Sequence, residues 1–142
     1  MAETGFSSFN TTTDKTNRIL KEIEQAYGWP KERRNMSYAA LRAVLHALRD
    51  RLTVEEAAQL GAQLPMLVRG IYYEGWDPSR VPMKMRRDEF LERVQREFRF
   101  RVEGGAESLV QTVLAAMRDH ITEGEWNDIK SGVSRDLASV LP

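Results

Sequence analysis

The sequence predicts an all-α protein made of two tandem four-helix units that pack into one compact helical bundle. Three observations lead to this prediction. Apolar residues recur every three or four positions along most of the chain, strict alternation is nearly absent, and one helical segment occurs twice. With 142 residues, the chain has room for one ordinary domain or for two very small ones.

Four apolar stripes with helical spacing mark the expected long helices. Each stripe gives a helix one face that it must bury, and this burial holds most helices in place in proteins. In chain order, the stripes are Ile19, Leu20, Ile23 and Tyr27; Leu41, Val44, Leu45, Leu48 and Leu52; Phe90, Leu91, Val94 and Phe98; and Leu109, Val110, Val113, Leu114, Met117 and Ile121.

The repeat is clearest where residues 44–56 (VLHALRDRLTVEE) match residues 113–125 (VLAAMRDHITEGE). Seven of the 13 positions are identical at an offset of 69 residues. The stripes that precede these two segments also match, at an offset of 71 residues. Each unit is therefore expected to hold two long helices followed by two short ones.

Capping signals indicate where the short helices begin. Thr53 and Glu56 have the spacing of a capping box, and so do Thr122 and Glu125. In this motif the hydroxyl accepts a hydrogen bond from a backbone N–H one turn later, and the carboxylate accepts one from the cap residue. Pro65 suits the first turn of a further helix, where a missing N–H costs little.

Glycine, serine and two prolines interrupt the helical pattern in the middle of the chain. These breaks divide the sequence into four segments. We expect a flexible N-terminus at residues 1–12, a first helical repeat at 13–76, a linker at 77–86 and a second helical repeat at 87–142.

The composition narrows the possible classes of protein. The 21 basic residues equal the 21 acidic ones, which argues against a dedicated polyanion binder. There is no cysteine, which rules out disulfides and thiol chemistry and is typical of a reducing compartment. No signal peptide is visible and no apolar run reaches 18 residues. We therefore expect a soluble cytoplasmic protein that does not bind membranes.

The stretch 41–76 contains the segment LPMLVRGIYYEGW at residues 64–76. This segment and the duplicated layout resemble the domain of unknown function 2267 family, and the resemblance covers residues 13–142. It implies a bacterial or archaeal, all-helical, soluble protein, and it implies no reaction, cofactor or catalytic residue. The second half departs from the pattern, because it reads VSRDLASVLP where the aromatic segment would recur.

No motif for catalysis or metal binding is found. The two histidines, His46 and His120, do not correspond in the repeat, and no HExxH, G-x-S-x-G or P-loop motif is present. His120 has Glu123 and Glu125 nearby, but a histidine at a helix end is also favoured by the helix dipole alone. We therefore expect no enzyme activity, no catalytic residue, no metal and no cofactor.

The candidate binding surface consists of Arg69, Tyr72, Tyr73 and Trp76. These residues fall on the sides of their helix adjoining and opposite a stripe formed by Leu64, Leu67, Val68 and Ile71. Arginine, tyrosine and tryptophan are enriched in binding hot spots. This face is expected either to bind a protein partner, including a second copy of the chain in a homodimer, or to pack between the two repeats. A helix end at Gly75 would move Trp76 off the face.

Two other functions stay open. A pocket between the repeats would make the chain a small-molecule-binding protein or a cryptic enzyme. The basic segment 80–101 would suit a weak nucleic-acid binder. Nucleic acid is disfavoured, because Glu89/Arg93 and Glu92/Arg96 have the spacing of ion pairs on a solvated helix face.

Overall fold

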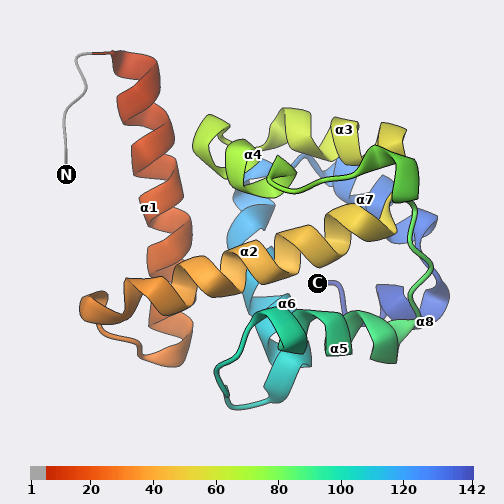
Figure 1. Cartoon of the computed structure of the whole chain (residues 1–142). Helices are drawn as coiled ribbons and strands as arrows, with labels where there is room; N and C mark the ends of the chain where they lie inside the picture. Colours follow the sequence, from red (N-terminus) through yellow and green to blue (C-terminus); the bar gives the residue numbers. More distant parts are fainter. Residues whose placement is uncertain (1–5) are drawn as a thin grey trace.

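The computed structural model describes residues 6–142, which form eight α-helices and three 3-10 turns (Figure 1). The all-α class is confirmed for this part of the chain. The helices are α1 (Ser7–Tyr27), α2 (Arg34–Arg51), α3 (Val54–Gln63), α4 (Met66–Tyr73), α5 (Arg87–Glu97), α6 (Gly105–Met117), α7 (Glu123–Gly132) and α8 (Arg135–Ala138). The 3-10 turns are Lys31–Arg33, Pro78–Arg80 and Arg118–His120.

Helix α2 is the centre of the fold. It contacts α1, α4, α5 and α6, and Figure 1 shows it crossing the molecule between α3 and α4 on one side and α5 and α6 on the other. The stripe expected on it is confirmed, since all five of its residues are at most 1% exposed. Residues 43–50 are all buried, so His46, Arg49 and Asp50 must find polar partners inside the protein.

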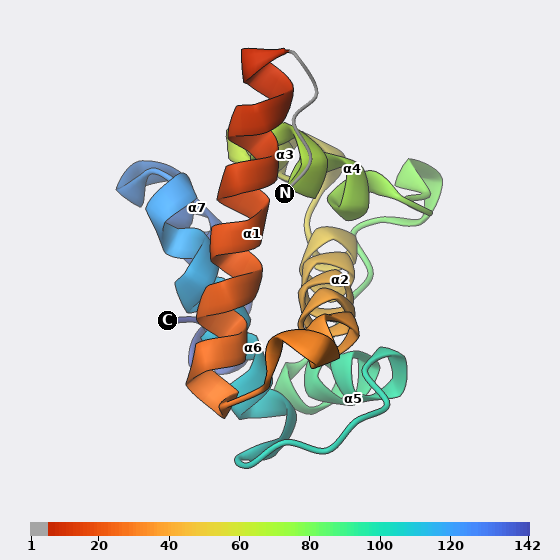
Figure 2. The ribbon, with the colours of Figure 1, turned by 90° about the vertical axis from the view of Figure 1, so that its left-hand side faces the viewer.

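Helix α1 crosses α2 and packs against both α2 and α6 (Figure 1 and Figure 2), and its Ile19 and Ile23 are buried in the shared core. It begins at Ser7, so residues 7–12 are helical where we expected a flexible segment. The expectation for residues 1–5 lies outside the described part of the chain. One reason for the longer helix is that the hydroxyl of Thr12 accepts a 2.8 Å hydrogen bond from the backbone N–H of Leu67, which ties α1 to the start of α4.

The two capping motifs differ in their partners. At Thr53 both bonds of the capping box form, with Glu56 N 3.2 Å from the hydroxyl and Thr53 N 2.9 Å from the Glu56 carboxylate. The hydroxyl of Thr122 also accepts from Glu125 N, at 3.2 Å. The N–H of Thr122, however, donates to the side-chain oxygen of Gln63 at 2.7 Å. At the second cap, Gln63 from the end of α3 therefore takes the role that Glu56 has at the first.

All eight helices contribute to one continuous cluster of buried apolar side chains. The expected stripe on α5 is part of it, with Phe90, Val94 and Phe98 at most 1% exposed. The segment between α4 and α5 lies against the end of α2, where Met83 N donates to the carbonyl of Asp50 at 2.7 Å. Among the helices of the described residues, none combines the length and the apolar character needed to cross a membrane.

We predict that Thr53→Ala lowers the free energy of unfolding by about 1 kcal/mol, because α3 loses its N-terminal cap. Thr53→Ser is the matched control, since serine keeps a hydroxyl in the same place. Urea denaturation followed by circular dichroism measures both variants. Equal losses for alanine and serine would contradict the prediction.

Candidate functional site

Arg69, the first residue of the expected binding surface, holds the end of α3. Its Nε donates to the carbonyl of Gly61 at 2.8 Å, and its Nη2 donates to the carbonyls of Leu64 at 3.0 Å and Ala62 at 3.3 Å. Gly61 and Ala62 belong to the last turn of α3 and Leu64 is its C-cap, so these carbonyls have no N–H four residues later in the helix to bind them. The guanidinium of Arg69 is therefore already committed to the fold.

Tyr72 is not exposed, which corrects its place in the expected surface. Its side chain is fully buried, and its hydroxyl donates to the carbonyl of Ala57 in α3 at 2.8 Å. Burial raises the pKa of this hydroxyl far above its ordinary value. The contact lies within the N-terminal helices, so Tyr72 does not join the two repeats at this point.

The orientation of α4 explains why Tyr72 is buried. The helix buries Val68 and Tyr72, four residues apart, while Leu67 is 46% exposed. Leu64 is buried, but Ile71 is only half-buried. The apolar stripe and the aromatic face overlap on so short a helix, and the spacing alone does not say which of the two faces the core.

Tyr73 and Trp76 are half-buried. The ring of Tyr73 lies 5.0 Å from that of Tyr72 and 5.3 Å from that of Trp76. It also covers Gly61, where an added Cβ would collide with the tyrosine hydroxyl. Helix α4 ends at Tyr73, and Gly75 follows with a φ of +76°, so Trp76 leaves the helix as the glycine indicated.

A buried polar network at the end of α2 is a feature that the sequence did not predict. The Nη1 of Arg49 donates to the carbonyls of Tyr72 at 2.9 Å and Glu74 at 2.8 Å, and its Nε donates to the carboxylate of Asp50 at 2.9 Å. Asp50 also accepts from Arg93 of α5 at 2.7 Å. The available signal was that Arg49 and Asp50, of opposite charge, stand between the stripe residues Leu48 and Leu52.

His46 belongs to the same buried part of α2. Its Nε2 lies 2.7 Å from the carbonyl of Ile71, so it donates a hydrogen bond to α4. Burial lowers the pKa of His46, and this effect outweighs the opposing hydrogen bond. His46 is therefore a core histidine that fixes α4 on α2. Within residues 6–142, no three histidine, aspartate or glutamate side chains gather in a way that could hold a metal ion.

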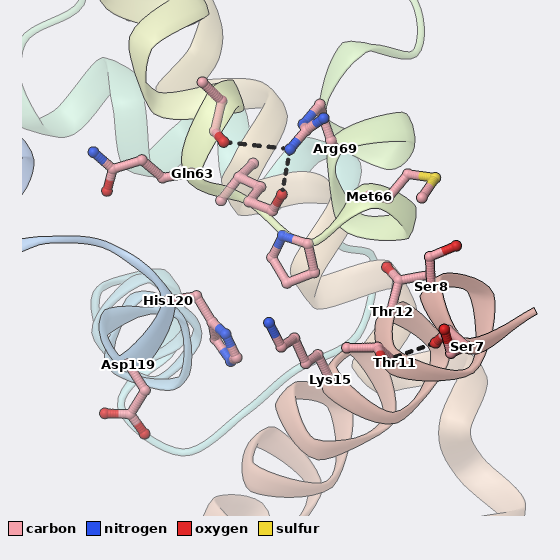
Figure 3. Close-up of a pocket in the computed structure, with 13 residues that line it drawn as sticks. Ser7, Ser8, Thr11, Thr12, Lys15, Gln63, Met66, Arg69, Asp119 and His120 are labelled. Atoms are coloured by element: carbon pink, nitrogen blue, oxygen red, sulfur yellow. Dashed lines mark hydrogen bonds between the residues drawn. The ribbon is translucent and has the colours of Figure 1, made fainter.

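A cleft of about 610 Å³ lies where α1, the α3–α4 connection and the 3-10 turn Arg118–His120 meet, and we call it the junction cleft. Figure 3 shows Lys15 and His120 pointing toward one another across it. Burial lowers the pKa of His120, and the positive charge of Lys15 adds to this effect. Gln63, Pro65 and Arg69 also line the cleft.

Exposed apolar side chains stand at the mouth of the junction cleft, and we call Phe6, Phe9, Met66 and Leu67 the apolar rim. They are 64%, 44%, 49% and 46% exposed. Met66 lines the cleft, and the Thr12–Leu67 hydrogen bond brings Leu67 to α1. Phe9 precedes Thr12 by three residues and so lies on the same face of α1. The ring of Phe6 lies 5.3 Å from that of Phe9.

A second cleft, of about 570 Å³, lies between the segment after α4 and helix α5. Four arginines from the basic segment line it, and we call it the arginine cleft: Arg80, Arg93, Arg96 and Arg99. Arg93 pairs with Asp50 at 2.7 Å and with Glu97 at 3.6 Å rather than with the expected Glu89. Among the described ion pairs, the expected Glu92–Arg96 pair is not formed.

Comparison with known proteins identifies the chain only by its family. A family model described as "Uncharacterized conserved protein (DUF2267)" matches residues 16–140. The chain therefore belongs to this family, as the resemblance of residues 64–76 indicated. No curated protein matches it.

We predict that Asp50→Asn lowers the free energy of unfolding at pH 7 by about 3 kcal/mol, because the buried Arg49 loses its carboxylate partner. Burial opposes ionisation of Asp50, but hydrogen bonds from Arg49 and Arg93 outweigh it and hold its pKa below the ordinary value. The carboxylate therefore stabilises the fold above about pH 4, and this contribution is lost as the pH falls through the lowered native pKa.

The gap between wild type and Asp50→Asn should accordingly shrink on acidification. Urea titrations between pH 7 and pH 3 measure it, and Glu92→Gln, at an exposed position of α5, is the control. A gap that is small at pH 7, or that widens in acid, would show that the network does not stabilise the fold in this way.

Proposed function

We propose that this member of an uncharacterised family is a non-enzymatic protein-interaction module, and that its binding surface is the junction cleft with its apolar rim. One observation carries the proposal: four large apolar side chains, from the N-terminal end of α1 with its N-cap residue and from the start of α4, are exposed beside one cleft. Exposed apolar groups that gather beside polar ones are typical of protein–protein interaction sites.

The polar groups of the cleft support binding rather than catalysis. Thr12 caps α4, Arg69 binds the carbonyls at the end of α3, and Gln63 caps Thr122. These side chains are already used by helix ends and are not free to act on a substrate. Lys15, Asp119 and His120 remain on the cleft wall, and they favour a partner that carries polar side chains beside its apolar ones.

The proposed binding surface differs from the one expected from the sequence, and the two share one residue. Arg69 lines the junction cleft, while Tyr72 is buried beneath α4. Tyr73 and Trp76 are half-buried and do not line this cleft. The partner is a protein, and a second copy of the chain is one such partner. A cytoplasmic location stays a prediction that rests on the cysteine-free sequence.

We also propose that the cleft lies at a junction between two four-helix units related by a pseudo-twofold axis. Gln63 at the end of α3 meets Thr122 before α7, and the Glu56 carboxylate at the start of α3 approaches Gly132 at the end of α7. Shifting Gln63 by the repeat offset gives Gly132. Thr122 corresponds in the same way to Thr53, whose cap Glu56 completes. In each half, the end of one short helix thus approaches the capping motif of the other, which supports an antiparallel twofold pairing of α3 and α7.

The proposal predicts that a photoreactive p-benzoylphenylalanine at position 67 forms a covalent adduct with a protein partner in cells that make the protein naturally. The matched control is the same residue at position 54, because Leu67 and Val54 are both 46% exposed but Val54 lies at the start of α3, outside the apolar rim. Denaturing gels and mass spectrometry identify the adduct as a second copy or another protein.

An adduct at position 67 that is missing at position 54 supports the apolar rim as the binding surface. The adduct should also disappear when the probe stays at position 67 and Met66→Glu is added. Equal adducts at both positions, or none at position 67, would refute the proposal. Circular dichroism confirms that each variant is folded.

A further inference from the structure

The arginine cleft collects positive charge from three separate parts of the chain. Arg80 ends the 3-10 turn after α4, Arg93 and Arg96 lie on α5, and Arg99 follows that helix. Met83 N donates to the carbonyl of Asp50, and this bond holds the segment that carries Arg80 against the end of α2. The fold, and not the sequence order alone, brings these guanidiniums to one cavity.

The carboxylates on the wall of the cleft are already occupied. Asp50 binds Arg49 and Arg93. Asp77 accepts hydrogen bonds from the N–H and the hydroxyl of Ser79, at 3.0 and 2.6 Å. Glu97 pairs with Arg93 at 3.6 Å.

Three of the four arginines keep their charge available. Arg80, Arg96 and Arg99 are exposed, and no ion pair joins them to a carboxylate within residues 6–142. Arg93 is different, because its side chain is only 16% exposed and forms an ion pair with Asp50. Asp50 is itself held by an ion pair with the buried Arg49. The cleft thus combines one guanidinium held in place by an ion pair with three exposed ones.

We propose that the arginine cleft is a binding site for a compact phosphorylated small molecule. Guanidinium groups present parallel N–H donors that match phosphate oxygens, and they keep their charge at every physiological pH. A volume of about 570 Å³ is the size of a small-molecule site rather than of a single-ion site. The site shares no residue with the junction cleft, so this proposal is independent of the proposed interaction surface.

The same geometry argues against an extended nucleic acid. Arg87, farther along the basic segment, is engaged with Glu107 at 2.6 Å and does not extend the positive surface. The whole chain also carries no net charge.

Pyrophosphate is the probe that tests the site. We expect saturable binding of pyrophosphate to the full chain by isothermal titration calorimetry at low ionic strength, with amide shifts in an NMR titration centred on residues 75–83 and 93–99. The double variant Arg96→Gln/Arg99→Gln should weaken binding at least about tenfold, because two charge-assisted hydrogen-bonding groups are lost.

Two further variants make the test specific. Arg135→Gln removes an exposed charge on α8, outside the cleft, and should change the dissociation constant by less than about twofold. Glu97→Gln removes a carboxylate from the wall while Asp50 still holds Arg93, so it should tighten binding a few-fold. If these residues acted only on folding, Arg96→Gln/Arg99→Gln and Glu97→Gln would not change the dissociation constant for pyrophosphate in opposite directions.

Each contrary result overturns the proposal. Pyrophosphate that does not bind at low salt, or that binds Arg96→Gln/Arg99→Gln as well as wild type, removes the site. If a 12-nucleotide single-stranded DNA binds more tightly than pyrophosphate and its affinity falls with salt by several released ions, the surface binds a polyanion instead.

Discussion

The buried guanidinium of Arg49 is the interaction on which the arrangement of the helices depends. It donates to the last carbonyls of α4, at Tyr72 and Glu74, and to the carboxylate of Asp50, which holds Arg93 of α5. A buried charge without partners costs several kcal/mol, so each of these contacts is needed for the others to be stable. One side chain of the central helix thereby fixes both the helix before the central connection and the helix after it.

Two clefts lie where the N-terminal and C-terminal helices meet. The helices before residue 74 and those after residue 86 share one apolar core. At one place on its surface, α1 and the α3–α4 connection meet the 3-10 turn that ends in His120, and the junction cleft results. At the end of α2, the connection that carries Arg80 bends back over Asp50, and the arginine cleft results. Both candidate sites therefore lie between the N-terminal and C-terminal helices.

Much of the fold was predictable because helix formation and capping are local. The stripes on α2 and α5 are buried, and the Thr53 capping box forms as its spacing indicated. The candidate site was less predictable because it depends on tertiary packing. The orientation of α4 about its own axis exposes Leu67 and buries Tyr72, and the sequence alone permits either face to pack against the core. The basic segment was visible, but its gathering of Arg80 with Arg96 and Arg99 depends on how the connection folds back.

The repeated sequence also shows why identical residues do not imply identical roles. Arg49 and Asp50 recur at the repeat offset as Arg118 and Asp119, yet only the first pair is buried. Arg118 instead lies over the ring of Trp126, with its guanidinium carbon 5.1 Å from the ring centroid.

Asp119 is exposed and lines the junction cleft. The first copy is constrained because it must satisfy the end of α4 and reach α5. No such requirement acts on Asp119, and its side chain is left at the cleft wall. A duplicated segment can thus stabilise the fold in one copy and contribute to a binding surface in the other, with the difference set by what packs against each.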